Sequence, residues 1–184
     1  MAVQLKRQLF TVDDYYKMAE VGILKPTDRV ELINGEIIQM SPIKSLHASV
    51  VDTLSAELNF QLRGKAIIRT QNPIRINQYS EPEPDIGIAK FKKDKYRAYH
   101  PTPEDVLLII EIADTILMKD RTIKKQLYAE AGIPEYWIVN LKEQEIEVYR
   151  EPAGKTYSES STIRPGENIT SANIDFELAV DILF

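Results

Sequence analysis

The longest apolar run of the chain lies near its middle. Residues 105–113 read DVLLIIEIA, and their six Val, Leu and Ile side chains follow one another without polar alternation. Such a run is typical of a central strand covered on both faces, and its β-branched residues, with Pro101 and Pro103 upstream, favour strand over buried helix. Glu111 interrupts the run. Because an ionised carboxylate there is costly unless it is paired or coordinated, Glu111 is a candidate functional residue.

The flanking pattern predicts further helices and strands. Thr11 and Asp14 form a capping-box signature for a helix that ends near Glu20, and Asn34-Gly35 marks the turn of a hairpin within residues 29–40. A second helix is predicted over 45–61, with an apolar face formed by Leu46, Val50, Val51, Leu54, Leu58 and Leu62. The other predicted elements are strands at 66–70, 74–76, from Pro84 onward and at 136–140, a helix at about 118–131, an exposed strand at 144–150 and a weakly alternating tail.

These elements predict an α/β fold. The strand–helix–strand unit from Asp105 to Asn140 predicts a parallel pair, and the hairpins add antiparallel strands. We therefore expect a mixed central sheet flanked by helices, preceded by an N-terminal helix and hairpin. No repeat or linker divides residues 1–184, so we expect a single domain.

Composition narrows the possible functions. The chain contains no cysteine, which excludes disulfides, thiolate zinc sites and a cysteine nucleophile. It has no secretion-type apolar segment and no run of membrane-spanning length, so we expect a cytoplasmic protein that does not enter membranes. A net charge of −5 and a pI near 5.2 argue against broad, nonspecific nucleic-acid binding. A local basic groove or a metal-bridged contact stays open.

Asp85 and Glu111 are the main candidates for chemistry. Asp85 lies in the segment Glu83 to Ala89, at the mouth of an apolar strand, about 25 residues before Glu111. Two carboxylates on neighbouring strands suggest a divalent metal site. The alternative is structural: Asp85 could cap a turn after Pro84, and Glu111 could form an ion pair with a helix.

The helix at 118–131 holds further candidates. Its predicted apolar stripe consists of Ile116, Ile123, Leu127 and Ala131. At 100° per residue, Asp120 lies within that stripe, Lys119 and Lys124 lie on its edges, and Lys125 points toward solvent. Lys124 could therefore reach the sheet, or it could form only a surface pair with Asp120.

Two other residues have simple structural interpretations. Glu31 could lie on the outward face of an alternating strand. His47 could rest at the edge of an apolar helix face.

Several segments of the chain occur in the order typical of one bacterial family. They are Glu31 to Glu36, Ser41-Pro42 to His47, Glu83-Pro84-Asp85-Ile86, Leu108 to Ala113, Asp120-x3-Lys124-x3-Tyr128, and Ala131 to Asn140. With Tyr15-Tyr16 they cover nearly the whole chain, and the most specific is Gly-Ile-Pro-Glu-Tyr-Trp at 132–137. In these segments the chain resembles the Uma family of restriction-endonuclease-like proteins.

The resemblance implies a PD-(D/E)xK nuclease-type fold. Asp85 matches the aspartate after the proline, and Glu111 matches the second acidic ligand. The lysine usually found two residues later is absent, because Ala113 occupies that position. Family members of this kind supply it from the following helix, which here gives Lys124. Glu31 matches an additional acidic residue early in such folds.

The resemblance also implies a mechanism. Asp85, Glu111 and the main-chain carbonyl of Ile112 would hold Mg²⁺ or Mn²⁺, which supplies Lewis-acid polarisation of a phosphodiester and a water of lowered pKa. Lys124 would orient that water or neutralise charge in the transition state, and Glu31 would orient the lysine or a second-shell water. The implied function is metal-dependent hydrolysis of DNA phosphodiester bonds by an endonuclease.

Two other functions stay open from the sequence. One is a non-enzymatic DNA- or protein-binding module with a vestigial acidic site, and the other is hydrolysis of a smaller phosphodiester. The basic, aromatic loop Lys90 to Arg97 could follow a phosphate backbone or could simply be solvated. A homodimer is a further expectation, because nuclease folds of this type often pair to cut two strands, and the strand at 144–150 could offer an edge.

Overall fold

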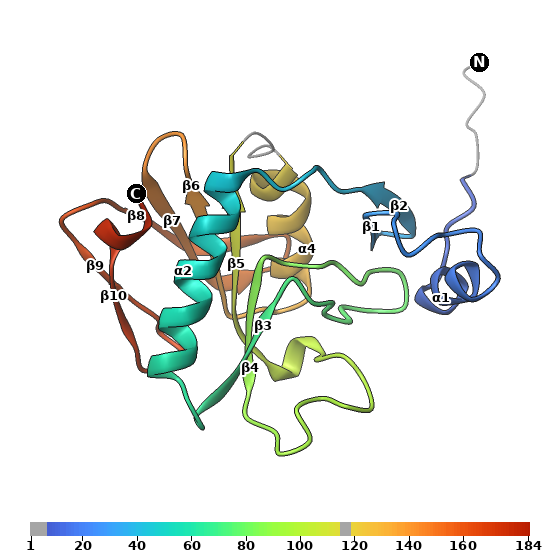
Figure 1. Cartoon of the computed structure of the whole chain (residues 1–184), viewed down its shortest axis with the longest axis horizontal. Helices are drawn as coiled ribbons and strands as arrows, with labels where there is room; N and C mark the ends of the chain where they lie inside the picture. Colours follow the sequence, from blue (N-terminus) through green and yellow to red (C-terminus); the bar gives the residue numbers. More distant parts are fainter. Residues whose placement is uncertain (1–6, 115–118) are drawn as a thin grey trace.

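The computed structural model describes residues 7–114 and 119–184 (Figure 1). Its centre is a six-stranded sheet with the strand order β3-β4-β5-β6-β7-β8. The strands are β3 (Ala66–Thr70), β4 (Ile86–Lys90), β5 (Val106–Ala113), β6 (Glu135–Asn140), β7 (Glu145–Ala153) and β8 (Thr156–Ile163). β5 and β6 are parallel, and the other neighbouring pairs are antiparallel. The predicted mixed α/β sheet is confirmed.

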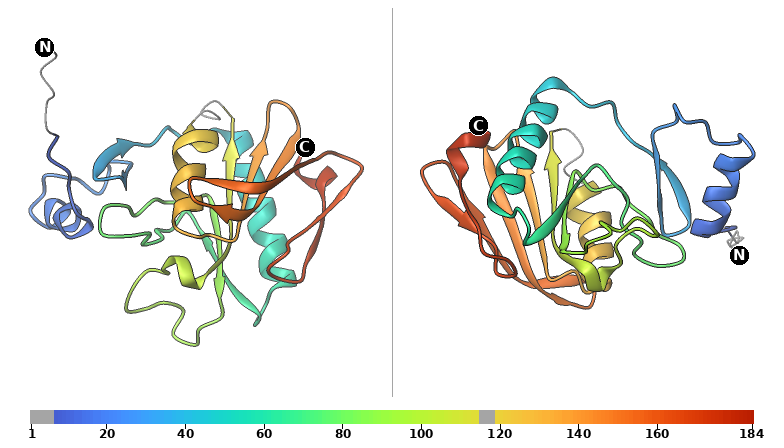
Figure 2. Two further views of the ribbon diagram at one scale, coloured as in Figure 1. Left: turned by 180° about the vertical axis from the view of Figure 1, so that it is seen from behind. Right: turned by 60° about the horizontal axis from the view of Figure 1, so that its bottom comes forward.

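Helices cover both faces of this sheet. They are α2 (Ser45–Gln61) on one face and, on the other, the π-helical turn η2 (Asp120–Lys124) that continues into α4 (Lys125–Glu130). Figure 1 has α2 in front of the sheet, and the reverse view in Figure 2 has α4 in front. Even-numbered residues 108–112 of β5 pack in the cluster with α2, whereas Ile109 and Ala113 pack in the cluster with α4. By this alternation, Glu111 points to the α4 side.

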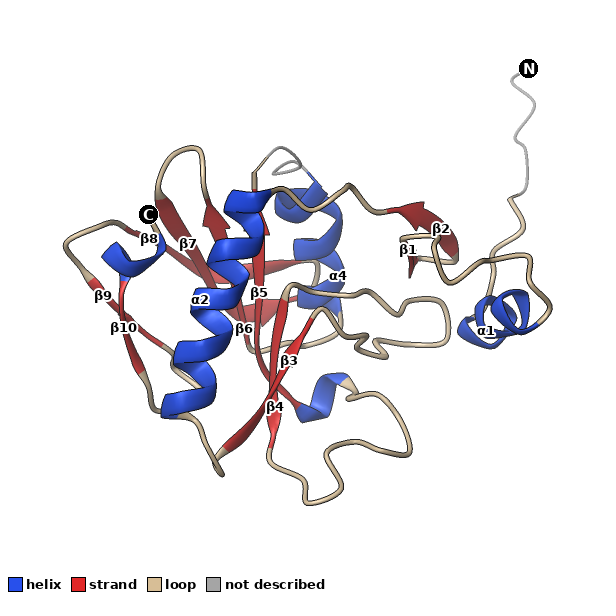
Figure 3. Ribbon diagram, in the orientation of Figure 1, coloured by secondary structure: helices blue, strands red, loops and turns tan. Residues whose placement is uncertain are grey.

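The N-terminal helix and hairpin lie beside the sheet rather than in it (Figure 3). They are α1 (Val12–Glu20), β1 (Val30–Ile33) and β2 (Glu36–Gln39). The predicted capping box between Thr11 and Asp14 is present. Asn34 and Gly35 both have positive φ, 52° and 75°, as the predicted tight turn requires. A Cβ at Gly35 would lie 2.6 Å from Leu9 Cβ, so the turn also needs glycine for close packing.

The C-terminal tail packs against the α2 side of the sheet. Its elements are the paired strands β9 (Asn168–Thr170) and β10 (Glu177–Ala179) and the 3₁₀ turn η3 (Val180–Leu183); a further 3₁₀ turn, η1 (Pro103–Asp105), precedes β5. Ile169, Phe176 and Leu178 of the tail belong to the same buried cluster as α2. Among the described residues, no helix is long and apolar enough to span a membrane.

Some sequence predictions about side-chain burial and strand pairing were wrong. Leu46 is 55% exposed, because the first turn of α2 extends past the sheet-covering part of its apolar face. Residues 74–76 are extended but form no strand, although Ile74 and Ile76 are buried in the α4-side cluster. The strand predicted at 144–150 is not exposed: β7 lies between β6 and β8 and has no free edge for a dimer.

The helix after β5 also buries a different set of side chains from the one that the helical wheel predicted. Ile123 is 48% exposed, because the π-helical turn of η2 changes the angle between successive side chains. Ile116 and the predicted helix start at Met118 lie outside the described residues. Leu127 is buried as predicted.

Candidate active site

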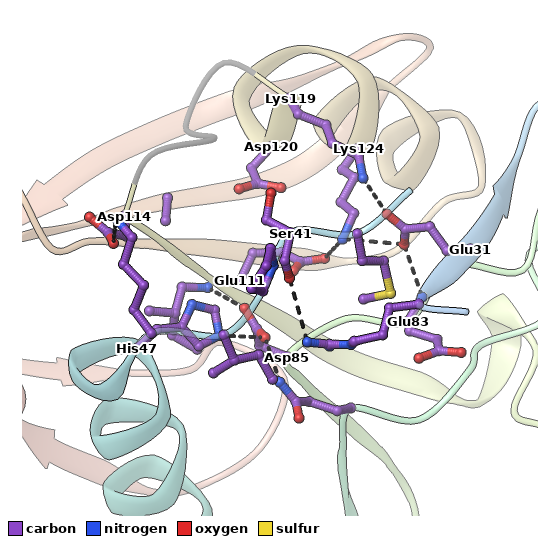
Figure 4. Close-up of a pocket in the computed structure, with 18 residues that line it drawn as sticks. Glu31, Ser41, His47, Glu83, Asp85, Glu111, Asp114, Lys119, Asp120 and Lys124 are labelled. Atoms are coloured by element: carbon purple, nitrogen blue, oxygen red, sulfur yellow. Dashed lines mark hydrogen bonds and ion pairs between the residues drawn. The ribbon is translucent and has the colours of Figure 1, made fainter. Parts of the chain in front are cut away.

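A cavity of about 110 Å³ opens at the end of the sheet where β4 begins and β5 ends (Figure 4). It is lined by side chains from β1, from the first turn of α2, from the ends of β4 and β5, and from η2. Asp85, Glu111, Lys124 and Glu31 all line it, as does Ile112. The structure therefore brings the five residues proposed from the sequence to one place, although they are up to 93 positions apart in the chain.

Asp85 is held at the mouth of β4 by hydrogen bonds from three elements. Its Oδ2 accepts from the Ile112 N–H at 2.8 Å, and its Oδ1 lies 2.9 Å from His47 Nε2 and 3.3 Å from Gln71 Nε2. Burial alone would raise the pKa of Asp85, but the hydrogen bond and charge of His47, with help from Ile112 and Lys124, lower it. Asp85 is thus an ionised carboxylate fixed between strand and helix, rather than the cap of a local turn.

The main chain of Ile112 lies next to Asp85 in the same cavity. The register of β4 with β5, extended by two residues beyond Ile86, sets Pro84 opposite Ile112. Proline has no N–H to donate to the Ile112 carbonyl. The Ile112 N–H points to Asp85, and the carbonyl of the same residue points to the same side of the strand. The Ile112 carbonyl is therefore an oxygen donor beside Asp85.

Lys124 joins two buried carboxylates. Its Nζ donates to Glu111 Oε1 at 2.8 Å and lies 3.5 Å from Glu31 Oε2, and all three side chains are at most 5% exposed. Tyr128 OH also donates to Glu111 Oε1, at 3.0 Å. Burial would lower the pKa of Lys124, but the charges of Glu111, Glu31 and Asp120 raise it instead. The amine is therefore a fixed positive charge beneath the cavity.

Glu31 is not on an outward strand face. It is 1% exposed and is paired with Lys119 as well as Lys124, and its Oε2 accepts from the Glu83 N–H at 3.2 Å. Burial would raise its pKa, but the two lysines lower it. The interpretation of Glu31 as a residue on an outward strand face was wrong, because the hairpin packs the face that carries Glu31 against the loop before β4.

The π-helical turn η2 aims two charged side chains at the sheet. Asp120 and Lys124 are both buried, so the surface-pair interpretation is wrong and Lys124 reaches toward the sheet. Lys125 is half-buried, with its amine 4.6 Å from the centre of the Tyr149 ring. The helix thus presents adjacent lysines to two different environments, and only Lys124 lines the cavity.

His47 is the residue that sequence reasoning missed. It was interpreted as structural, yet it lines the cavity and its Nε2 contacts Asp85. The hydrogen bond to Asp85 raises the pKa of His47, although burial opposes this. The position of His47 in the first turn of α2 gave no local signal, because its partner is 38 residues away. The one available signal was its place in the Ser41–His47 segment of the family resemblance.

The cavity carries an excess of negative charge. Among the described residues that line it are four Lys or Arg side chains and six carboxylates, those of Glu31, Glu83, Asp85, Glu111, Asp114 and Asp120. Burial, together with Asp120 and Asp85, raises the pKa of Glu111 to about 8 despite the opposing charge of Lys124. Burial also raises the pKa of Asp120 to about 6. These carboxylates repel one another in the metal-free protein.

The donor atoms suit a hydrated divalent cation. Oε2 of Glu111 accepts no hydrogen bond from residues 7–114 or 119–184, and Ile112, whose N–H donates to Asp85, also lines the cavity. Carboxylate and carbonyl oxygens are the ligands that Mg²⁺ and Mn²⁺ prefer, and Mg²⁺ keeps several waters. Within the described part of the chain, no three carboxylate or imidazole groups already surround a common point. The residues therefore fit an ion that retains much of its water.

The raised pKa of Glu111 predicts how stability depends on pH. The folded metal-free protein should hold a proton on this carboxyl that the unfolded chain loses near pH 4.5, so stability should fall as pH rises from about 4.5 to about 8. The slope from one such group is at most about 1.4 kcal/mol per pH unit. His47 and Asp120 act in the same direction. Thermal unfolding in EDTA between pH 5.5 and 8.5 should show a flatter profile for Glu111→Gln than for the wild type. Equal slopes would contradict the prediction.

The fold and this cavity define a restriction-endonuclease-like α/β protein. A family model described as "Putative restriction endonuclease" matches residues 12–181, and the chain belongs to this family, Uma2. A solved structure described as a putative nuclease of the DUF820 family, from Anabaena variabilis ATCC 29413, has the same fold, with a TM-score of 0.73. The two chains are 17% identical, and the alignment covers 95% of this chain and 97% of the other. A comparison with curated proteins finds no match.

Proposed function

We propose that this protein is a metal-dependent endonuclease that hydrolyses phosphodiester bonds in DNA. The observation that carries the proposal is the meeting of Asp85, Glu111 and Lys124 in one cavity at the end of the sheet. Membership of the Uma2 family and the nuclease-like fold support a nuclease-type activity. Metal dependence and DNA as substrate rest on the chemistry of the cavity.

Asp85, Glu111 and the Ile112 carbonyl would hold Mg²⁺ or Mn²⁺. A bound divalent cation supplies Lewis-acid polarisation of the phosphodiester and a water of lowered pKa. Lys124 presents a positive charge to the negative charge that develops on the transferring phosphoryl group, and Glu31 holds the lysine in place at 3.5 Å. His47 fixes the orientation of Asp85 from α2.

The substrate phosphate would be attracted by the other cations of the cavity rather than by the basic loop. Arg29, Lys44 and Lys119 line the cavity. The loop that follows β4 begins at Lys90, at the end of that strand opposite Asp85. We therefore assign the contact with the scissile phosphate to the cavity. Any DNA contact by the loop would lie farther along the duplex.

One observation favours a second candidate, a non-enzymatic DNA- or protein-binding module. The Glu31–Lys124–Glu111 network is complete without a metal, as expected for a purely structural ion-pair cluster. The two candidates differ in one respect. A nuclease needs the excess negative charge of the cavity to bind a dication, whereas a vestigial site does not.

Cleavage of supercoiled plasmid DNA tests the proposal directly. Purified protein should nick or linearise the plasmid with Mg²⁺ or Mn²⁺ and should be inactive in EDTA. Asp85→Asn, purified in parallel, should lose at least about 10²-fold in rate, because it replaces a charged metal ligand with a weaker neutral one. Asp52→Asn, an equal change of charge on the exposed face of α2, should cleave like the wild type. Residual activity that is equal in Asp85→Asn and wild type would indicate a contaminant and would remove the proposal.

A further inference from the structure

Asp120 is a buried carboxylate in the cavity whose side chain forms no hydrogen bond or ion pair with residues 7–114 or 119–184. It is 8% exposed and lines the cavity from η2. Its side chain has no hydrogen bond or ion pair with any residue in the described ranges, and Figure 4 shows it beside the cavity without a dashed contact. The neighbouring cations are engaged elsewhere: Lys119 pairs with Glu31, and Lys124 pairs with Glu111 and Glu31. The Asp120 backbone is fixed, because Tyr136 OH donates to its carbonyl at 3.3 Å.

Such a residue is costly in the isolated chain. An ionised carboxylate in a largely buried position needs a compensating hydrogen bond or charge. The charges of Lys124 and Lys119 favour the ionised form of Asp120, but burial and the charges of Asp85 and Glu31 oppose it more strongly. Lys119 and Lys124 each share their charge with Glu31 or Glu111, so a bound cation would add the stabilisation that Asp120 lacks. The burial of Asp120 and its lack of a partner among the described residues therefore point to a bound cation.

The size of the cavity indicates how that cation is held. A volume of about 110 Å³ has room for several water molecules. No three of the described carboxylate or imidazole side chains converge closely enough to surround an ion directly. A dication that binds Asp85 and Glu111 would therefore keep water ligands on its remaining faces, as Mg²⁺ commonly does. Asp120 lies where it can accept hydrogen bonds from those waters.

We propose that Asp120 binds the hydrated divalent cation through the waters of its coordination shell, as a third acidic group opposite Asp85 and Glu111. This inference rests on the proposed function, because it assigns a residue to the same metal site. It makes Asp120 a positioning residue for the ion and its waters. Asp120 and Lys124 lie four positions apart in η2, and both line the cavity.

A structural role for Asp120 makes the opposite prediction. An acidic residue in the first turn of a helix can stabilise the positive end of the helix dipole by about 0.3–1 kcal/mol. If that were its role, Asp120→Asn would destabilise the metal-free protein. If Asp120 instead serves to bind a cation, Asp120→Asn should relieve its repulsion with the other carboxylates of the cavity. The metal-free variant should then be as stable as the wild type or more stable.

Two measurements on the full-length protein test the inference: Mn²⁺ affinity by isothermal titration calorimetry, and the thermal midpoint in EDTA. Asp120→Asn should bind Mn²⁺ about 10–100-fold more weakly than the wild type, while its midpoint in EDTA stays the same or rises. Asp120→Glu, which keeps the charge, should recover most of the affinity. Asp52→Asn should change neither quantity. If Asp120→Asn does not fold, the same two measurements are made on Asp120→Ser, which also removes the charge.

The outcomes separate this inference from the proposed function. If Asp85→Asn loses Mn²⁺ binding while Asp120→Asn and Asp120→Ser keep wild-type affinity, the inference is overturned and the nuclease proposal stands. If the wild type itself binds no Mn²⁺, both are overturned. A lower midpoint of Asp120→Asn in EDTA with unchanged Mn²⁺ affinity would assign Asp120 a structural role only.

Discussion

Replacing Lys124 with methionine should lower the rate of plasmid cleavage by about 10²–10³-fold, the usual effect of removing one preorganised charge from a transition state. The same change should lower the free energy of unfolding of the metal-free protein by about 3–5 kcal/mol, because it leaves the buried Glu111 without its cation and Glu31 with Lys119 alone. Both follow from the contacts of the amine with Glu111 at 2.8 Å and Glu31 at 3.5 Å. Cleavage is measured on plasmid, and unfolding by urea denaturation in EDTA. Added Mn²⁺ should restore part of the lost stability but not the activity.

The neighbouring lysine provides the matched control. Lys125→Met removes the same charge one residue later, where the amine lies over the Tyr149 ring outside the cavity. It should cost about 1 kcal/mol or less and leave cleavage unchanged. If the two variants behaved alike, the effect of Lys124 would be one of net charge or helix stability, and its assigned role would be lost. A combined Lys124→Met and Glu31→Gln variant should recover stability without recovering activity.

Replacing Glu135 with alanine should lower the free energy of unfolding by about 3–5 kcal/mol without a direct effect on the cavity. Glu135 is fully buried at the start of β6, and its Oε1 accepts from Trp137 Nε1 and from Arg150 Nε, both at 2.8 Å. Its Oε2 accepts from the hydroxyl of Ser171, at 2.6 Å, and from the N–H of Ala172, at 3.0 Å. One carboxylate therefore ties the C-terminal tail to the sheet, and its loss leaves the Arg150 guanidinium without its counter-ion.

Glu130→Ala is the control for this prediction. Glu130 forms an exposed pair with Lys155 at 3.2 Å, and surface pairs of this kind contribute about 1 kcal/mol or less. Urea denaturation of both variants, followed by tryptophan fluorescence, measures the difference. The Trp137 emission is a suitable probe, because the indole donates to Glu135 itself. Similar losses for the two glutamates would show that Glu135 does not anchor the tail.

The sequence predicted the elements whose signals are local. The capping box at Thr11, the Asn34-Gly35 turn and the uninterrupted apolar run of β5 each depend on residues within a few positions of one another. Backbone conformation and side-chain periodicity set these features before any tertiary contact forms. The order of the predicted strands and helices along the chain was enough to predict a mixed sheet. The carboxylates at 85 and 111 were identifiable because each stood beside or within an apolar strand.

Other features depended on contacts that no local pattern encodes. Ile146 and Val148 of β7 are buried in the same cluster as α2 and the C-terminal tail, which lie far from them in the chain. The exposure of Ile123 followed from a π-helical turn that the 100° helical wheel does not describe. Both are consequences of packing against neighbours elsewhere in the chain.

By itself, the sequence determined where strands, helices and turns form, because hydrophobic periodicity and turn chemistry act over a few residues. Only the tertiary structure decided which charged side chains share the cavity. His47 contacts Asp85 across 38 positions, and Lys124 lies between Glu111 and Glu31 from a different element than either. The physical reason is that the cost of burying a charge depends on the distance to its partner in space, which chain spacing does not fix.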